Sequence, residues 1–175
     1  MSDDDRDHDL ESLRISQEEA RTVLDHQINT FSEVDQKAAE TTRLVALLLG
    51  LILTAASIIA QSDLTLDPYL NWAIFLGIIF LIVSFIFSVI TYTSTDIETG
   101  IGKQDIDRLI ERKYTEKDWL ILLLRSEGEW MKSNETRLTR NNRWLFAGHL
   151  CLVLGVILVV VGVVIGILEV PVLLL

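Results

Sequence analysis

The sequence predicts an all-α fold, a three-span helical membrane protein with a cytoplasmic helical hairpin. Half of its 175 residues are hydrophobic, and they are concentrated in three stretches that contain no charged side chain. Each stretch approaches or exceeds the roughly 20 residues that a helix needs to cross a bilayer. Too little polar chain remains to cover three such helices in water, so the pattern favours membrane insertion.

The chain before the first apolar stretch is expected to form a tail and one helix. Residues 1–9 are strongly acidic and predict a disordered tail. Residues 10–43 predict a cytoplasmic amphipathic helix of coiled-coil type, because apolar residues recur at heptad-like spacing. These positions include Leu10, Leu24, Phe31 and Ala38. No signal peptide is expected, since the start is acidic and no apolar run precedes Leu44.

The predicted spans are residues 44–62, 69–92 and 144–168. No Lys or Arg occurs from Leu44 to Gly102, and none follows Arg143. With three spans, all 15 basic residues fall on one side of the membrane, which the positive-inside rule makes cytoplasmic. The expected protein is therefore a multi-pass cell-membrane protein. Its N-terminus would be cytoplasmic, and residues 169–175 would form a short outer tail.

Small residues are regularly spaced within the spans and predict helix-packing stripes. The positions are Gly50 in the first span, Gly77 and Ser84 in the second, and Gly148, Gly155, Gly162 and Gly166 in the third. Two interpretations stay open: the stripes pack the three helices of one chain together, or some of them face neighbouring copies or line a pore. The spans contain no Asp, Glu, Lys or Arg, which disfavours a proton-coupled transporter.

Residues 93–143 are expected to form a cytoplasmic loop and helices. Thr115 and Asp118 have the spacing of a helix N-cap and its partner, and the helix could then continue unbroken into the third span. It would pair with the helix over 10–43 as an antiparallel hairpin. The apolar run WLILLL at 119–124 could be core, an interfacial segment or a contact between protomers. Three cations at three-residue spacing are suited to anionic lipid headgroups; they are Arg137, Arg140 and Arg143.

No catalytic or ligand motif is present, so we expect neither an enzyme nor a bound cofactor. The sequence has no phosphate-binding glycine loop and no Cys/His cluster with zinc spacing. Nucleic acid is an improbable partner at a pI near 4.7. The expected partners are the lipid bilayer, further copies of the chain in a homo-oligomer and a cytoplasmic protein.

The tetrapeptide Asp35-Gln36-Lys37-Ala38 directly before the first span, together with the layout of residues 31–168, resembles the transmembrane module of SLATT-type and Pycsar-type antiphage effectors. The resemblance implies that Asp35, Lys37 and Ala38 lie at the junction between cytoplasmic helix and membrane. It also implies an activity, oligomerisation that impairs membrane integrity on a nucleotide signal. This sequence carries no appended nucleotide-sensing domain, so a trigger would come from a separate partner. Its acidic, lysine-poor composition resembles that of salt-adapted archaea.

Two functions are therefore expected. The first is a self-associating integral membrane protein that acts as a signal-triggered, membrane-perturbing effector. The alternative is a membrane-anchored scaffold that docks a cytoplasmic partner through its helical hairpin.

Overall fold

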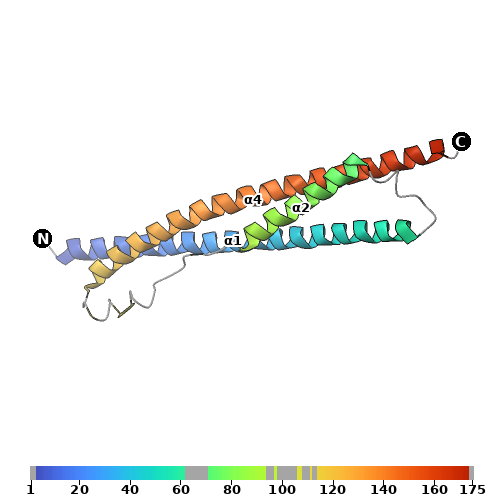
Figure 1. Cartoon of the computed structure of the whole chain (residues 1–175). Coiled ribbons are helices and arrows are strands. Elements are labelled where there is room, and N and C mark those ends of the chain that lie inside the picture. Colours follow the sequence, from blue (N-terminus) through green and yellow to red (C-terminus); the bar gives the residue numbers. More distant parts are fainter. Residues whose placement is uncertain are drawn as a thin grey trace. The chain divides into compact units, whose positions relative to one another are not determined.

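The computed structural model describes residues 3–61, 71–93, 97, 106–107, 111 and 114–173. These residues form three long helices, α1 (Asp3–Gln61), α2 (Trp72–Thr93) and α4 (Glu116–Leu173) (Figure 1). No strand occurs in the described part of the chain. The all-α fold class is confirmed.

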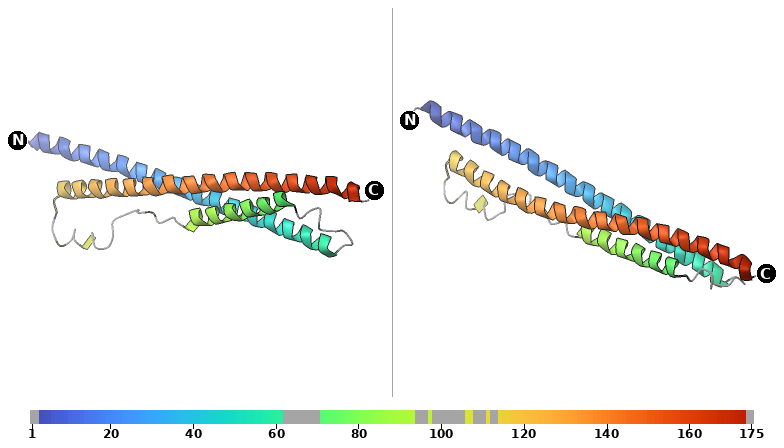
Figure 2. Two further views of the ribbon diagram at one scale, coloured as in Figure 1. Left: turned by 45° about the horizontal axis from the view of Figure 1, so that its top comes forward. Right: turned by 90° about the horizontal axis from the view of Figure 1, so that it is seen from above.

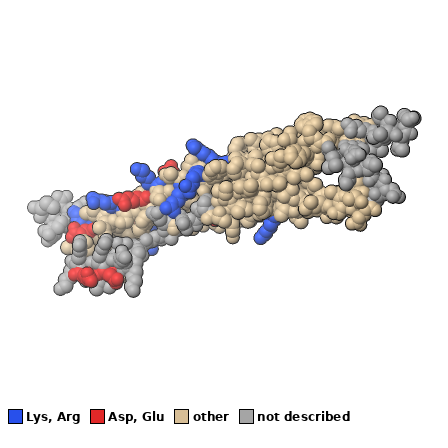
Figure 3. Space-filling model, viewed as in Figure 1, with Lys and Arg blue, Asp and Glu red and all other residues tan. Residues whose placement is uncertain are grey.

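Each of the three helices contains a stretch that is long and apolar enough to cross a membrane. In α1 and α4 this stretch is one part of a helix of 59 and 58 residues, whereas α2 is apolar over its 22 residues. Among the described residues drawn in Figure 3, the charged side chains gather away from these apolar stretches. This is the arrangement expected of a multi-pass membrane protein.

The helices extend beyond several of the predicted boundaries. α1 begins at Asp3, where the sequence predicted a disordered tail through residue 9; acidic residues suit a helix N-terminus. α4 continues to Leu173, into the segment predicted as an outer tail. The predicted start of the second span at residue 69 and most of the loop after residue 93 lie outside the described residues.

The chain divides into two compact units. The first unit comprises residues 1–33 and 95–140, and the second comprises residues 34–94 and 141–175. Within the first unit, α1 and α4 bury residues spaced seven apart, which is the spacing of a coiled-coil seam. These residues are Leu24 and Phe31 on α1 and Leu120, Glu127 and Asn134 on α4.

The two helices of the first unit run in the same direction, so the expected antiparallel hairpin is wrong. Arg14 bonds Glu116, and Gln27 Nε2 donates to the carbonyl of Met131 at 3.2 Å. The residue numbers rise together on both helices, as they do only in a parallel pair. The physical reason is topological. A chain with three successive spans passes through the first and the third in the same direction, so the helices that lead into them are also parallel.

In the second unit, α2 lies antiparallel to α4 (Figure 2). Asn71 at the start of α2 contacts Gly162, and Ser84 further along α2 contacts Gly148 earlier on α4. The described N-terminus of α4 carries the predicted cap: Thr115 Oγ1 accepts a hydrogen bond from the amide of Asp118 at 3.3 Å and donates to its carboxylate at 2.6 Å. The capping prediction is confirmed.

Candidate functional site: the packing face of α2 and α4

Three glycines bring α2 and α4 into close contact within the second unit. A Cβ atom added to Gly77 would lie 2.7 Å from Val159 Cγ2 and 2.9 Å from the carbonyl oxygen of Gly155. A Cβ added to Gly155 would lie 3.0 Å from the carbonyl oxygen of Gly77. A Cβ added to Gly162 would lie 2.8 Å from the backbone nitrogen of Ile74. Side chains at these positions would therefore force the helices apart, which is the reason for glycine at close helix crossings in membranes.

Asn71 links the N-terminal end of α2 to α4 through hydrogen bonds. Its Oδ1 accepts hydrogen bonds from the amides of Ala73 at 3.2 Å and Ile74 at 3.1 Å, which makes it the N-cap of α2. Its Nδ2 donates to the carbonyl of Gly162 at 2.7 Å. One side chain therefore caps one helix and bonds the next. The sequence analysis missed this residue, although an Asn directly before an apolar helical run is a recognised N-cap signal.

Further along the same face, Ser84 forms a second hydrogen bond between α2 and α4. Its hydroxyl donates to the carbonyl of Gly148 at 2.8 Å, and both residues are buried. A Cβ added to Gly148 would meet its nearest atoms at 3.4–3.6 Å, which is ordinary contact. Gly166 is also buried. At Gly148, as at Gly162, α4 offers a backbone carbonyl to a polar side chain of α2.

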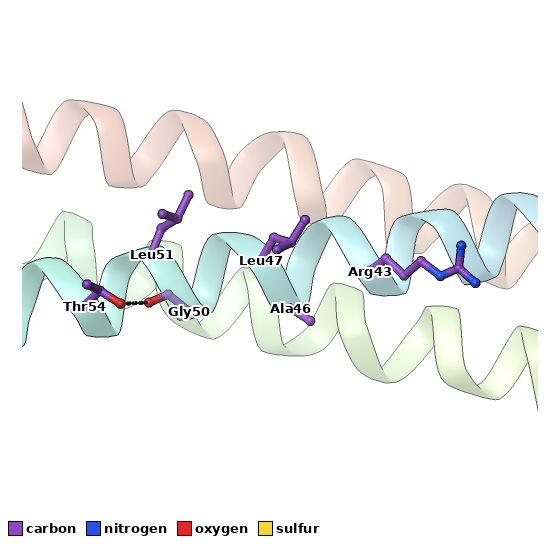
Figure 4. Close-up of a pocket in the computed structure, with 6 residues that line it drawn as sticks. All are labelled: Arg43, Ala46, Leu47, Gly50, Leu51 and Thr54. Atoms are coloured by element: carbon purple, nitrogen blue, oxygen red, sulfur yellow. Dashed lines mark hydrogen bonds between the residues drawn. The ribbon is translucent and has the colours of Figure 1, made fainter.

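Gly50 differs from the glycines of this face. No atom lies within 4 Å of a Cβ added there, and the residue is exposed. It lies in a shallow groove of about 640 Å³ on α1 (Figure 4). The groove is lined by Arg43, Ala46, Leu47, Gly50, Leu51 and Thr54. Thr54 Oγ1 already donates to the carbonyl of Gly50 at 2.8 Å, so the groove surface is almost wholly apolar.

The tetrapeptide that carries the family resemblance lies on the part of α1 that belongs to the second unit. Ala38 is fully buried, Asp35 is half-buried and Lys37 is exposed. The carbonyl of Lys37 accepts a bond from Thr41 Oγ1 at 2.8 Å, and the same hydroxyl lies 3.1 Å from His149 Nε2. His149 Nδ1 donates to the carbonyl of Leu145 at 3.0 Å, since a carbonyl can only accept. Thr41 and His149 thus join α1 to α4.

The three arginines proposed to meet lipid headgroups differ in exposure. Arg140 and Arg143 are exposed, and Arg137 is half-buried. Beside Arg143, the ring of Trp144 lies 5.3 Å from that of Phe87, measured between centroids. Among the residues that the structure describes, no group of three or more His, Cys, Asp or Glu side chains is placed to hold a metal ion.

The packing face is a structural site, in which Asn71 and Ser84 donate hydrogen bonds to backbone carbonyls of α4. No protein-family model, curated protein or solved structure matches the chain.

Proposed function

We propose that this protein self-associates in the cell membrane and acts there as a signal-triggered effector that impairs membrane integrity. Its N-terminus would be cytoplasmic and its C-terminus outside, because that orientation places every basic residue on the inner side. The resemblance of residues 35–38 to the antiphage effectors supports the effector activity.

The observation that carries self-association is the open face of α1 around Gly50. Gly77, Gly155 and Gly162 are occupied by contacts within one chain, so they are not available to a second copy. The most apolar window of α1 is only 6% buried, against 28% for α2. Ala46, Gly50 and Thr54 follow one another at the four-residue spacing that lets membrane helices approach closely. We infer that α1 of one copy packs on α1 of another through this face.

Cysteine cross-linking in native membranes tests this contact. In a full-length background with Cys151→Ser, Thr54→Cys should give a disulfide-linked dimer on oxidation. Phe75→Cys, which is also exposed but lies on α2, is the matched control and should not. Gly50→Leu should abolish the Thr54→Cys dimer, because its side chain fills the groove. Equal dimer yields at both positions, or no dimer at either, would contradict the contact.

Effector activity is tested by induced expression with a membrane-potential dye. The wild-type chain should depolarise cells, and Gly50→Leu should not, at matched expression. Depolarisation by both variants would separate activity from the α1 contact. Unchanged potential with the wild-type chain at good expression would contradict the effector function.

The alternative function is a scaffold that docks a cytoplasmic protein. It is favoured by exposed apolar side chains in the first unit: Ile121 and Leu122 are 42% and 41% exposed, although they lie within the apolar run at 119–124. In the same run Leu120 and Leu123 are buried, so the run is only partly used as core. The full-length chain should co-purify with a specific partner. The double variant Ile121→Ser, Leu122→Ser should lose that partner while the second unit stays folded.

A further inference from the structure

The seam of the first unit contains a buried carboxylic acid. Glu127 is 3% exposed and occupies the same heptad position on α4 as Leu120 and Asn134. Its Oε2 atom is buried without a hydrogen-bond partner. An ionised carboxylate has only acceptor atoms, so burial in this state is costly unless donors surround it.

A second side-chain acceptor without a partner lies on the facing helix. Gln27 of α1 uses its Nε2 to bond the carbonyl of Met131, one helical turn after Glu127, at 3.2 Å. Its Oε1 is buried and has no hydrogen-bond partner. This part of the seam therefore holds two side-chain oxygens that need a hydrogen. A proton bound to Glu127 would convert one of these acceptors into a donor.

The attraction between Glu127 and nearby charge offsets only part of the cost of burying its ionised carboxylate. Burial raises the pKa of Glu127 above its ordinary value of 4.5, and the Arg21 guanidinium on α1 lowers it in part. Among the described residues of α1 and α4, Arg21 is the charged group that acts on this carboxyl. Arg21 is itself exposed, so solvent weakens its attraction for the carboxylate.

We propose that Glu127 forms a proton-operated latch in the parallel seam of α1 and α4, which tightens when Glu127 binds a proton and loosens when it releases one. The latch would make opening of this unit depend on the pH of the compartment that bathes it. The proposal is independent of whether copies of the chain associate, because it concerns a seam within one chain.

The direction of the effect follows from proton linkage. A folded state whose carboxyl has a raised pKa binds protons more readily than the open state does. The contribution of Glu127 to seam stability is therefore greatest below pH 4.5, falls as the pH rises from 4.5 through the raised pKa of Glu127, and stays smaller above it. Between these two values, the opening equilibrium should shift by no more than about tenfold for each pH unit, because one proton is involved.

Amide hydrogen exchange of the full-length chain in nanodiscs tests the latch. Residues 116–140 are followed in the wild-type chain and in Glu127→Gln at each pH, so that the intrinsic pH dependence of exchange cancels. Gln keeps the shape, cannot ionise and carries a donor. The two chains should exchange alike near pH 4, and the variant should become progressively better protected toward neutral pH.

Arg21→Ala provides a second arm, since it removes the compensating charge and leaves Glu127 in place. This variant should exchange faster than the wild-type chain at neutral pH and equally fast near pH 4. In the double variant with Glu127→Gln, the effect of Arg21→Ala should disappear. A constant difference between wild type and Glu127→Gln at every pH would overturn the latch, as would a pH-dependent effect of Arg21→Ala that survives in the double variant.

Discussion

The two units use one heptad spacing on α4 to build opposite kinds of interface. In the first unit the buried positions at this spacing are Leu120, Glu127 and Asn134, and in the second they are Gly148, Gly155 and Gly162. In water, burial of large apolar side chains such as Leu24 and Phe31 supplies the driving force for pairing. In lipid that driving force is absent between helices, so close backbone approach and polar side chains that bond carbonyls take its place. The same period thus favours large residues in one solvent and the smallest in the other.

The largest expected effect comes from filling the glycine face of the second unit. Gly155→Leu should separate α2 from α4 and cost about 3 kcal/mol of unfolding free energy, the upper end of the range typical of overpacked cores. The free energy is measured by reversible unfolding of the full chain in mixed micelles. Gly50→Leu is the matched control, since a side chain there meets open space.

If Gly155→Leu and Gly50→Leu were equally stable as monomers, the difference between the two glycines would be refuted. The comparison also determines how such variants should be used. A loss of activity in Gly155→Leu would report damage to the fold of one chain, whereas a loss in Gly50→Leu would report damage to contacts between copies.

A smaller effect is expected at Asn71, and two variants divide its roles. Asn71→Ser keeps an N-cap oxygen but loses the donor to Gly162, so it should cost about 0.6 kcal/mol, which is typical of a hydrogen bond between membrane helices. Asn71→Ala loses both and should cost about 1 kcal/mol more. The same unfolding assay measures both variants. Equal costs for Asn71→Ser and Asn71→Ala would show that the N-cap adds nothing to the free energy of unfolding.

The smallest effect is expected at the ion pair of the first unit. The side chains of Arg14 and Glu116 are 63% and 54% exposed, and exposed pairs contribute about 0.2–1 kcal/mol. Arg14→Ala should therefore change seam stability by less than about 1 kcal/mol, and added salt should reduce the difference further. Hydrogen exchange over residues 116–140 measures it. If Arg14→Ala lowered seam stability more than Arg21→Ala does, solvent exposure would not be what limits the contribution of these charges.

Some of the candidate site was accessible to sequence reasoning because it rests on local patterns. The spacing of Gly148, Gly155 and Gly162 indicated a close helix contact before any partner was known, and the Thr115 cap follows from residues three apart. Asn71 was also within reach, since its cap is local. Its bond to Gly162 spans 91 residues, and no local pattern contains that information.

The parallel direction of α1 and α4 could have been deduced from the number of spans alone, and the prediction of an antiparallel hairpin overlooked it. The burial of Glu127 without a hydrogen-bond partner for its Oε2 atom could not have been deduced in this way. It depends on the register between α1 and α4, which no local pattern in the sequence contains.

The sequence by itself determined the all-helical fold and the three apolar stretches, because hydropathy and period are properties of each segment and its solvent. Only the tertiary structure decided which small residues meet a neighbour within the chain. Gly50, Gly77 and Gly155 are equivalent by composition and by their place in apolar helices. They differ because α2 and α4 approach each other closely enough to exclude a Cβ, whereas the outer face of α1 leaves that space open. Whether a glycine serves one chain or a second copy depends on the distance to the next helix, and that distance is a property of the packed structure.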